Sequence, residues 1–331
     1  MGKTIYLLSS GSLSRKDNTI VVENDDGRRF IPVETTDEIL VFGEVDLNKR
    51  FLEFAAQSEI ILHFFNRYGY YVGTYYPREH LNSGAVIIAQ ARHYLELDKR
   101  LALAKRFVHG AISNMEKVIS YYARRGKSEL EGANEKLAEF KDNLERCSDI
   151  SELMGLEGNA KDIYYSVFDE ITEDEEFVFE KRTKRPPANR VNALISFLNS
   201  LCYILVLSQI YRTHMDPRIG FLHESNFRRF SLNLDIAEIF KPILVDRLIF
   251  SLINKKMIQK KSFSERGGGL YLTDKGKEVV LKAWEDRLQS TIEHKGLRRN
   301  VSYRNLVRME VYKVEKHVLG DKLYEPFVAR W

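Results

Sequence analysis

The stretch VNALISFLNSLCYILVLSQIY, residues 191–211, contains no charged side chain and decides the fold class. It is long enough for an apolar helix to cross a bilayer. However, it carries Asn192, Asn199 and Gln209, together with several serines. Polar side chains of this kind find hydrogen-bond partners in a protein interior but not in lipid. We therefore interpret the stretch as the buried central helix of a mainly α-helical domain, and we expect no membrane association.

The composition of the chain is that of a globular protein. It has 331 residues, of which 44% are hydrophobic, so it can bury a core without disulfides or metals. Its 51 basic and 47 acidic residues give a net charge of +4, which permits nucleic-acid binding without demanding it. Its two cysteines, Cys147 and Cys202, are far apart in sequence, which favours a reducing compartment. We expect a cytoplasmic protein.

The amino-terminal part of the chain has a different pattern from the rest. Runs such as TIVVEN (19–24) and GYYVGTYY (69–76) are rich in β-branched and aromatic residues and are separated by turn residues. One helix is expected there, near residues 48–58. The sequence thus predicts an α+β protein with a small β-rich domain, residues 1–85, and a larger, mainly α-helical domain, residues 86–331.

A charge couplet precedes the central helix. Residues 169–180 contain seven acids, and residues 181–190 contain five bases. One interpretation is a solvated surface whose charges offset each other. The other is that Lys184, Arg185 and Arg190, in a Pro-Pro loop, contact the DNA backbone irrespective of base sequence.

The segment after the central helix carries a possible metal site. Asp235 and Glu238 are three residues apart, so they share one face of the helix that we expect between an N-cap at Ser231 and Pro242. Two carboxylates this close repel each other unless a cation lies between them. His223 lies upstream, beyond a turn that can fold the chain back. Imidazole and carboxylate donors suit Mn²⁺ or Mg²⁺.

A catalytic site of this type needs at least one further acid. The best candidate is Glu157, which precedes Gly158 at an expected helix start. Arg228 and Arg229 lie between the histidine and the two acids, and arginines beside a divalent cation indicate a phosphate-bearing substrate. On the residues alone, all these side chains are also open to interpretation as ordinary structural polar groups, since one histidine near two acids is common.

Four ordered motifs extend this reasoning. They are LMGLEGNAKDIYY (153–165), KRPPANRVNALISFLNSLCYILV (184–206), MDPRIGFLHESN (215–226) and RFSLNLDIAEIFKP (229–242). Together they resemble the family of CRISPR-associated endonucleases and integrases that insert new spacers into CRISPR arrays. The resemblance covers nearly the whole chain, and motifs of this length in order are more specific than any short pattern.

The resemblance implies an activity and partners. It implies a metal-dependent DNA endonuclease that cuts phosphodiester bonds in double-stranded and branched DNA and that integrates spacers by transesterification. It also implies a homodimer paired through the β-rich domains, joined by a small companion protein of the CRISPR adaptation complex.

The resemblance also assigns residues. It implies that Glu157, His223 and Glu238 are catalytic metal ligands, and that Asp235 is a supporting or alternate ligand in catalysis. Three further positions match the family's basic residue before the SL pair and its tyrosine after the EG pair, and we expect them to contact DNA: Arg229, Tyr164 and Tyr165.

One position departs from the family pattern. His214 stands where the resemblance leads us to expect a small residue, often glycine. Because it lies close to His223 in sequence, His214 is a candidate for an additional polar contact near the site.

A rival interpretation comes from the carboxy-terminal half. VDRLIFSLINKKMI (245–258), GGGLYLTDKG (267–276) and a helix beginning near Thr273 form the helix, turn, strand and helix order of a winged helix. That pattern suggests a non-enzymatic DNA-binding regulator, in which the acids and the histidine are structural. An interaction scaffold is a third alternative. The segment is also open to interpretation as part of the helical domain, which we favour.

Overall fold

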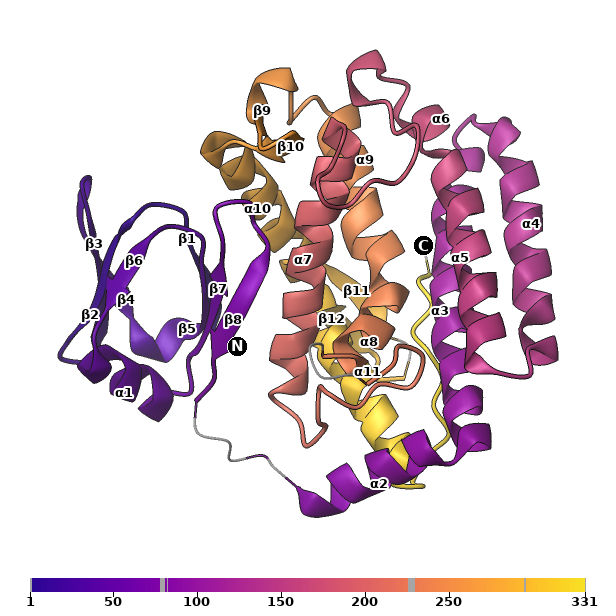
Figure 1. Ribbon diagram of the computed structural model, residues 1–331, viewed down its shortest axis with the longest axis horizontal. Helices are drawn as coiled ribbons and strands as arrows, with labels where there is room; N and C mark the ends of the chain where they lie inside the picture. Colours follow the sequence, from indigo (N-terminus) through magenta and orange to yellow (C-terminus); the bar gives the residue numbers. More distant parts are fainter. Residues whose placement is uncertain (1, 78–80, 82, 226–229, 295, 331) are drawn as a thin grey trace. The chain divides into compact units, whose positions relative to one another are not determined.

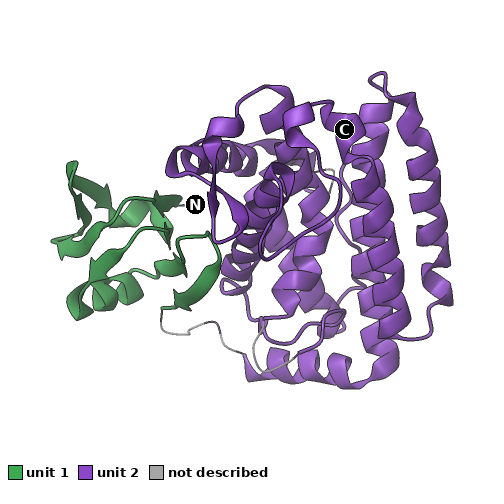
Figure 2. Cartoon of the chain, turned by 45° about the horizontal axis from the view of Figure 1, so that its top comes forward, with its two compact units in different colours: residues 1–80 green, residues 81–331 purple. Residues whose placement is uncertain are grey.

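The protein divides into two compact units, Met1–His80 and Leu81–Trp331 (Figure 2). The first unit contains mainly strands and the second mainly helices, which confirms the α+β class. The division lies five residues before the boundary expected from the sequence, at 85. The computed structural model describes residues 2–77, 81, 83–225, 230–294 and 296–330.

The first unit is built from two four-stranded sheets, with strand orders β1-β5-β7-β8 and β4-β3-β2-β6. In the first sheet β1, β5 and β7 are parallel, and β8 pairs with β7 in the antiparallel direction. The strands are β1 (Lys3–Leu7), β2 (Gly11–Lys16), β3 (Thr19–Asn24), β4 (Gly27–Pro32), β5 (Thr36–Val41), β6 (Val45–Leu47), β7 (Ile61–Phe65) and β8 (Tyr71–Tyr75).

The helix of this unit, α1 (Lys49–Gln57), confirms the prediction for residues 48–58. The side chain of Asn48 accepts a hydrogen bond from Phe51 N and so caps the first turn. Phe51 and Ala55 are four residues apart, so they lie on the same helix face, and both belong to the buried core that includes Ile39 and Leu62.

The second unit is a helical domain with two short hairpins (Figure 1). Helices α3 and α5 pack side by side, and α4 packs against both. The elements are α2 (Gly84–Leu95), α3 (Leu97–Ala123), α4 (Glu131–Asp142), α5 (Ile150–Ser166), α6 (Phe168–Thr172), α7 (Arg190–Ile210), α8 (Leu232–Lys241), α9 (Arg247–Asn254), β9 (Phe263–Arg266), β10 (Gly269–Leu272), α10 (Asp274–Gln289), β11 (Thr291–His294), β12 (Arg299–Ser302) and α11 (Tyr303–Val318).

Helix α7 is the central helix expected from residues 191–211, and it packs against α8 and α11. By length and composition it could cross a membrane, but 78% of its most apolar window is buried within the protein. Two of its buried polar side chains, Asn192 and Gln209, have hydrogen-bond partners there. Asn192 Oδ1 accepts from Arg182 Nη1 and Thr183 N, at 2.8 and 2.9 Å, and Gln209 Oε1 accepts from Arg308 Nε at 2.8 Å. These partners match the interpretation as a core helix.

The winged-helix-like segment forms the expected local structure. The antiparallel β9–β10 hairpin lies between α9 and α10 in the sequence, and Thr273 caps α10 by accepting from Gly276 N. The hairpin packs against α7, and Leu270 N donates to Pro187 O at 2.9 Å. These contacts integrate the segment into the helical unit.

Candidate functional site

Helix α8 carries the acidic residues singled out in the sequence. The sequence predicted that the Ser231 side chain caps this helix. Ser231 is the N-terminal flanking residue, but its side chain forms no capping hydrogen bond. Ser231 Oγ instead accepts from Gly220 N at 2.8 Å and donates to Arg218 O at 2.7 Å. Its hydroxyl therefore fastens the turn before His223 to the start of α8. The helix ends at Lys241, and a π-helical turn, Pro242–Asp246, leads into α9, as proline at this position favours.

Asp235 is fully buried and holds the segment that presents His223. Its carboxylate accepts from the backbone N–H groups of Phe221, Leu222 and His223, at 2.6, 3.1 and 2.9 Å. It also lies 2.8 Å from His223 Nδ1. Because a carboxylate only accepts, Nδ1 carries the hydrogen, and Nε2 is the ring nitrogen that can bind a metal when the ring is neutral. These contacts are those of a carboxylate that positions His223, which matches the supporting role among the two roles expected from the sequence.

Glu157 lies in the middle of α5, so the expectation of a helix start at this residue is wrong. The helix begins at Ile150, where the Asp149 side chain caps it by accepting from Glu152 N at 2.9 Å. The helix start was placed here because Gly158 follows Glu157. Glycine is, however, tolerated inside a helix at a modest cost, and Gly158 lies within α5. Glu157 is 7% exposed.

Glu157 and Glu238 come together around one ammonium group. Lys161 Nζ forms an ion pair with Glu157 Oε1 and lies 2.9 Å from Glu238 Oε2. A second ammonium, that of Lys241, binds Glu238 Oε1 and lies over the Tyr203 ring. Burial alone would raise the pKa of Glu238, but the charges of Lys161 and Lys241 hold it well below its usual range. Two carboxylates from distant parts of the sequence thus share a cation.

His223 borders this group. Burial alone would lower its pKa, but its hydrogen bond to Asp235 and the negative charges of Asp235, Glu238 and Glu157 outweigh burial and raise it. Among the residues that the structure describes, no three His, Cys, Asp or Glu side chains form a ready-made metal group. The ammonium of Lys161 stands between the two glutamates instead.

The basic loop reaches the same region. The pKa of Lys184 is lowered by partial burial and by the positive charges of Arg182, Lys161 and Lys241. Lys184 and Arg185 are exposed. Arg190 Nη1 instead donates to Glu176 O at 2.6 Å, which ties it to the acidic half of the couplet. The hydrogen bond to Glu176 gives the Arg190 side chain a structural role. Lys184, in contrast, adds positive charge near Glu238.

The two tyrosines expected to contact DNA belong to the interior of the domain. Tyr164 is 1% exposed and packs against Phe168, so its assignment to direct DNA contact is wrong. Tyr165 is half-buried and stacks on Phe179 with ring centroids 5.3 Å apart. Aromatic burial behind the site explains both positions better than DNA contact. Burial also raises the pKa of the neighbouring Asp246 to about 7, against the opposing effects of Lys241 and Tyr164.

Three positions near the histidine complete the comparison with the sequence. His214 Nδ1 lies 3.0 Å from Glu315 Oε1 on α11, so its polar contact is with that helix. Arg228 and Arg229 lie outside the described residues.

Sequence reasoning missed the two lysines of the site. Lys161 follows Glu157 by four residues, and Lys241 follows Glu238 by three. Such spacings are the signal that could have found them, but they are also common on exposed helices, where they stabilise by only about 0.2–0.5 kcal/mol.

Comparison with known proteins identifies the family. The family described as CRISPR associated protein Cas1 matches residues 5–286. A curated relative, CRISPR-associated endonuclease Cas1 2 of Thermodesulfovibrio yellowstonii, is 56% identical over 331 residues, with 100% of both chains covered.

Solved structures agree with this match. A CAS1 protein from Thermotoga maritima is 51% identical, with a TM-score of 0.89 over 98% of this chain and 99% of that one. A casposase bound to integration product shares the fold, with a TM-score of 0.88 at 18% identity, over 98% of this chain and 93% of that one. The family match and the close relatives show that this chain belongs to the CRISPR-associated Cas1 family.

Proposed function

We propose that this chain, a DNA endonuclease and integrase of CRISPR adaptation, performs its chemistry at Glu157, His223 and Glu238 with a bound Mn²⁺ or Mg²⁺. The observation that carries the proposal is the convergence of Glu157 and Glu238 on a single cation beside His223. Two neighbouring carboxylates repel each other unless a cation lies between them, so holding them together is costly. A scaffold or a regulator gains nothing from such a pair, whereas a metal-dependent enzyme uses it to bind the cation.

The donor chemistry of these residues fits such a metal. Two carboxylates and one imidazole, without a thiolate, are typical of Mn²⁺ and Mg²⁺ sites. The carboxylates already surround a positive charge, that of Lys161. Metal binding therefore requires the ammonium of Lys161 to leave the carboxylates that become ligands.

The protein side chains have distinct tasks. Asp235 holds the His223 ring through Nδ1, so Nε2 is the nitrogen that remains for a metal. A carboxylate commonly positions a metal-binding histidine in this way. Lys241 and Lys184 supply positive charge beside the carboxylates, which favours binding of a phosphodiester. A divalent cation, when bound, would polarise the scissile phosphate and activate a water or a DNA 3′-hydroxyl.

The partners follow from the same proposal. Double-stranded and branched DNA are the substrates, and the basic loop 181–190 contributes backbone contacts. We also propose a homodimer that pairs through the β-rich unit and binds the small companion protein of the adaptation complex. Both assemblies are supported by the resemblance of the motifs to the family to which the chain belongs.

The proposal is tested by cleavage of linear and branched DNA with Mn²⁺, Mg²⁺ or EDTA. Glu157→Ala, His223→Ala and Glu238→Ala should each lower metal-dependent cleavage by about 100-fold or more, since metal catalysis supplies several kcal/mol. Asp162→Ala, an exposed change on the same helix as Glu157, should leave cleavage unchanged.

Two results would contradict the metal-site proposal. The first is that the three variants remain folded and cut as fast as the parent protein. The second is DNA binding that His223→Ala leaves unchanged, together with no cleavage by the parent protein in any metal. That second pattern is the one expected of a winged-helix regulator.

A further inference from the structure

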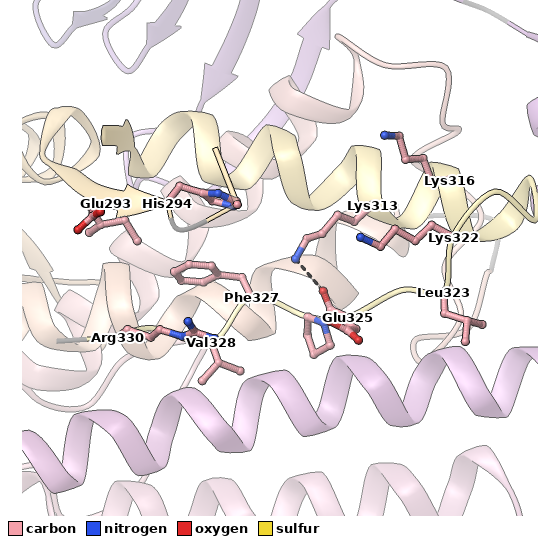
Figure 3. A pocket seen from close by; sticks show the side chains of 13 residues that line it. Glu293, His294, Lys313, Lys316, Lys322, Leu323, Glu325, Phe327, Val328 and Arg330 are labelled. Carbon is pink, nitrogen blue, oxygen red and sulfur yellow. Dashed lines mark hydrogen bonds between the residues drawn. The ribbon is translucent and has the colours of Figure 1, made fainter. Parts of the chain in front are cut away.

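A second region of the helical unit has the features of a binding site. Strand β11, helix α11 and the carboxy-terminal segment 319–330 enclose a cavity of about 320 Å³ (Figure 3). Sites for small ligands occupy about 300–1,000 Å³, so this volume is at the lower end of that range. In Figure 3, Lys313 and Lys322 reach the cavity from one side, and Phe327 and His294 lie on the other.

The lining of the cavity has an excess of positive charge. Lys316, Lys322 and Arg330 are exposed, and within the described part of the chain none of them has a side-chain hydrogen bond or an ion pair. Lys313 is already engaged, since its Nζ lies 2.6 Å from Glu310 Oε2 and donates to a backbone carbonyl at 2.7 Å. Two exposed carboxylates, Glu293 and Glu325, also line the cavity and only partly offset the cations.

The wall formed by the carboxy-terminal segment is anchored by buried groups. Glu310 is 1% exposed and accepts from Tyr324 Oη at 2.6 Å and from Phe327 N at 2.9 Å. Asn114, also buried, accepts from Ala329 N at 2.8 Å and donates to Phe327 O at 2.9 Å. The cavity is therefore part of the fold.

The cavity lies apart from the carboxylate site. Phe327 stacks on Phe240 of α8, with ring centroids 5.7 Å apart and planes inclined by 7°. Phe240 and Glu238 are two residues apart on one helix, so their side chains project about 200° from each other around its axis. The cavity and the paired glutamates consequently lie on opposite sides of α8.

We propose that this cavity binds the phosphates of a DNA strand, with Lys316, Lys322 and Arg330 as the phosphate-binding residues and the Phe327 ring as a surface for one base. Lysine and arginine side chains without partners attract phosphates, and aromatic rings stack on bases irrespective of sequence. An acidic protein surface is a poorer match, because a cavity of about 320 Å³ with a phenylalanine in its lining suits one nucleotide better. The choice of DNA as the source of phosphate rests on the proposed function, whereas the cation-lined cavity does not.

The test compares two triple variants of the full chain. In one, K316Q/K322Q/R330Q removes the three unpaired cations of the cavity. In the other, K117Q/K136Q/K282Q removes three exposed lysines elsewhere on the unit and changes the net charge by the same amount. Both are made in a His223→Ala background with EDTA, which prevents cleavage. Fluorescence anisotropy of a labelled single-stranded oligonucleotide is measured across a range of NaCl concentrations.

The cavity variant should bind the oligonucleotide more weakly than the control variant. Its slope of log K against log salt should be smaller by about 2, since three phosphate contacts to a single strand contribute roughly 0.7 each. Equal affinity and equal slope in the two variants, with thermal unfolding showing that both are folded, would overturn the proposal. Lys322→Glu alone, a change on an exposed side chain, should weaken binding in the same direction and gives a second variant if the triple one unfolds.

Competition identifies the source of the phosphate. Unlabelled oligonucleotide should displace the labelled strand, and inorganic phosphate at the same phosphate concentration should not. Displacement by both at equal concentration would reject the DNA assignment in favour of a free phosphate ligand. These measurements record binding without cleavage. Their result can therefore be interpreted even if the nuclease assay contradicts the metal-site proposal.

Discussion

Lys161 is the residue on which the site of this protein depends most when no metal is bound. Among the described side chains, its ammonium is the one that pairs with both Glu157 and Glu238. Replacing it by methionine, a side chain without charge, leaves the buried Glu157 without the cation that it shares with Glu238, whereas Lys241 still pairs with Glu238. We expect Lys161→Met to lower the free energy of unfolding in EDTA by up to about 3–5 kcal/mol, as for other broken buried ion pairs.

The same change should strengthen metal binding, because Mn²⁺ no longer competes with the ammonium for the carboxylates. Calorimetric titration should give a lower Kd for Mn²⁺, and Mn²⁺ should raise the Tm of Lys161→Met more than that of the parent protein. Lys136→Met, at an exposed position on α4, is the control and should behave as the parent protein. An unchanged Kd together with an unchanged Tm increment would show that Lys161 does not occupy the metal position.

Asp246 should make the stability of the protein depend on pH. Burial raises its pKa in the folded state to about 7, from an ordinary value of 3.8. The folded protein therefore holds this proton more tightly than the unfolded chain does. The stability that results is complete below about pH 4 and is lost as the pH rises through about 7.

Asp246→Asn removes this dependence, because an amide does not ionise. The free energy of unfolding of the variant relative to the parent protein should increase between pH 5 and pH 8, by at most about 1.4 kcal/mol per pH unit. Urea denaturation at several pH values measures this difference, with the exposed Asp162→Asn as the control. A constant difference across that range would mean that Asp246 is ionised throughout in the folded protein.

At the scale of elements, the approach of the turn before His223 to helix α8 limits what can replace Gly220. A Cβ atom at this position would lie 2.7 Å from Ser231 C and 2.9 Å from Asp235 Oδ2, closer than real contacts allow. Gly220→Ala should therefore push the turn away from α8 and disturb the hydrogen bonds that hold His223. We expect a loss of about 1–3 kcal/mol in unfolding free energy, and cleavage reduced more than the loss of folded protein explains.

Gly155→Ala on helix α5 is the matched control. A Cβ atom there would meet nothing within 4 Å apart from its chain neighbours and the backbone of its own helix, and alanine in a helix is favoured over glycine by about 0.5–1 kcal/mol. This variant should be as stable as the parent protein or more so, with full activity. If Gly220→Ala cleaved DNA at the parent rate, the turn would not be needed to position His223.

At the scale of the whole molecule, the two units allow the proposed dimer to be tested. Each unit has its own buried core, and α2 begins at Gly84, so a chain of residues 81–331 keeps all elements of the helical unit. If the β-rich unit forms the dimer, this shortened chain should sediment as a monomer at concentrations where the full chain is a dimer. A shortened chain that dimerises with unchanged affinity would place the interface in the helical unit.

Much of the fold and part of the site were predictable from the sequence. The helix at Lys49–Gln57, the apolar helix α7 and the Thr273 cap depend on residues close in sequence, so local patterns were sufficient to find them. Burial was harder to predict. Tyr164 was assigned to DNA contact because a motif gives the order of residues without saying which side of a helix is covered.

The sequence by itself determined the α+β class, the family and the candidate side chains Glu157, His223 and Glu238, because these follow from composition, periodicity and ordered motifs. Only the tertiary structure decided that Glu157 and Glu238 meet around Lys161, that Asp235 supports His223, and that cations gather behind α8. The physical reason is that α5 and α8 both pack against α3, so their side chains meet only through contacts between segments far apart in the sequence. The spacing of a few residues cannot specify such a contact between distant segments.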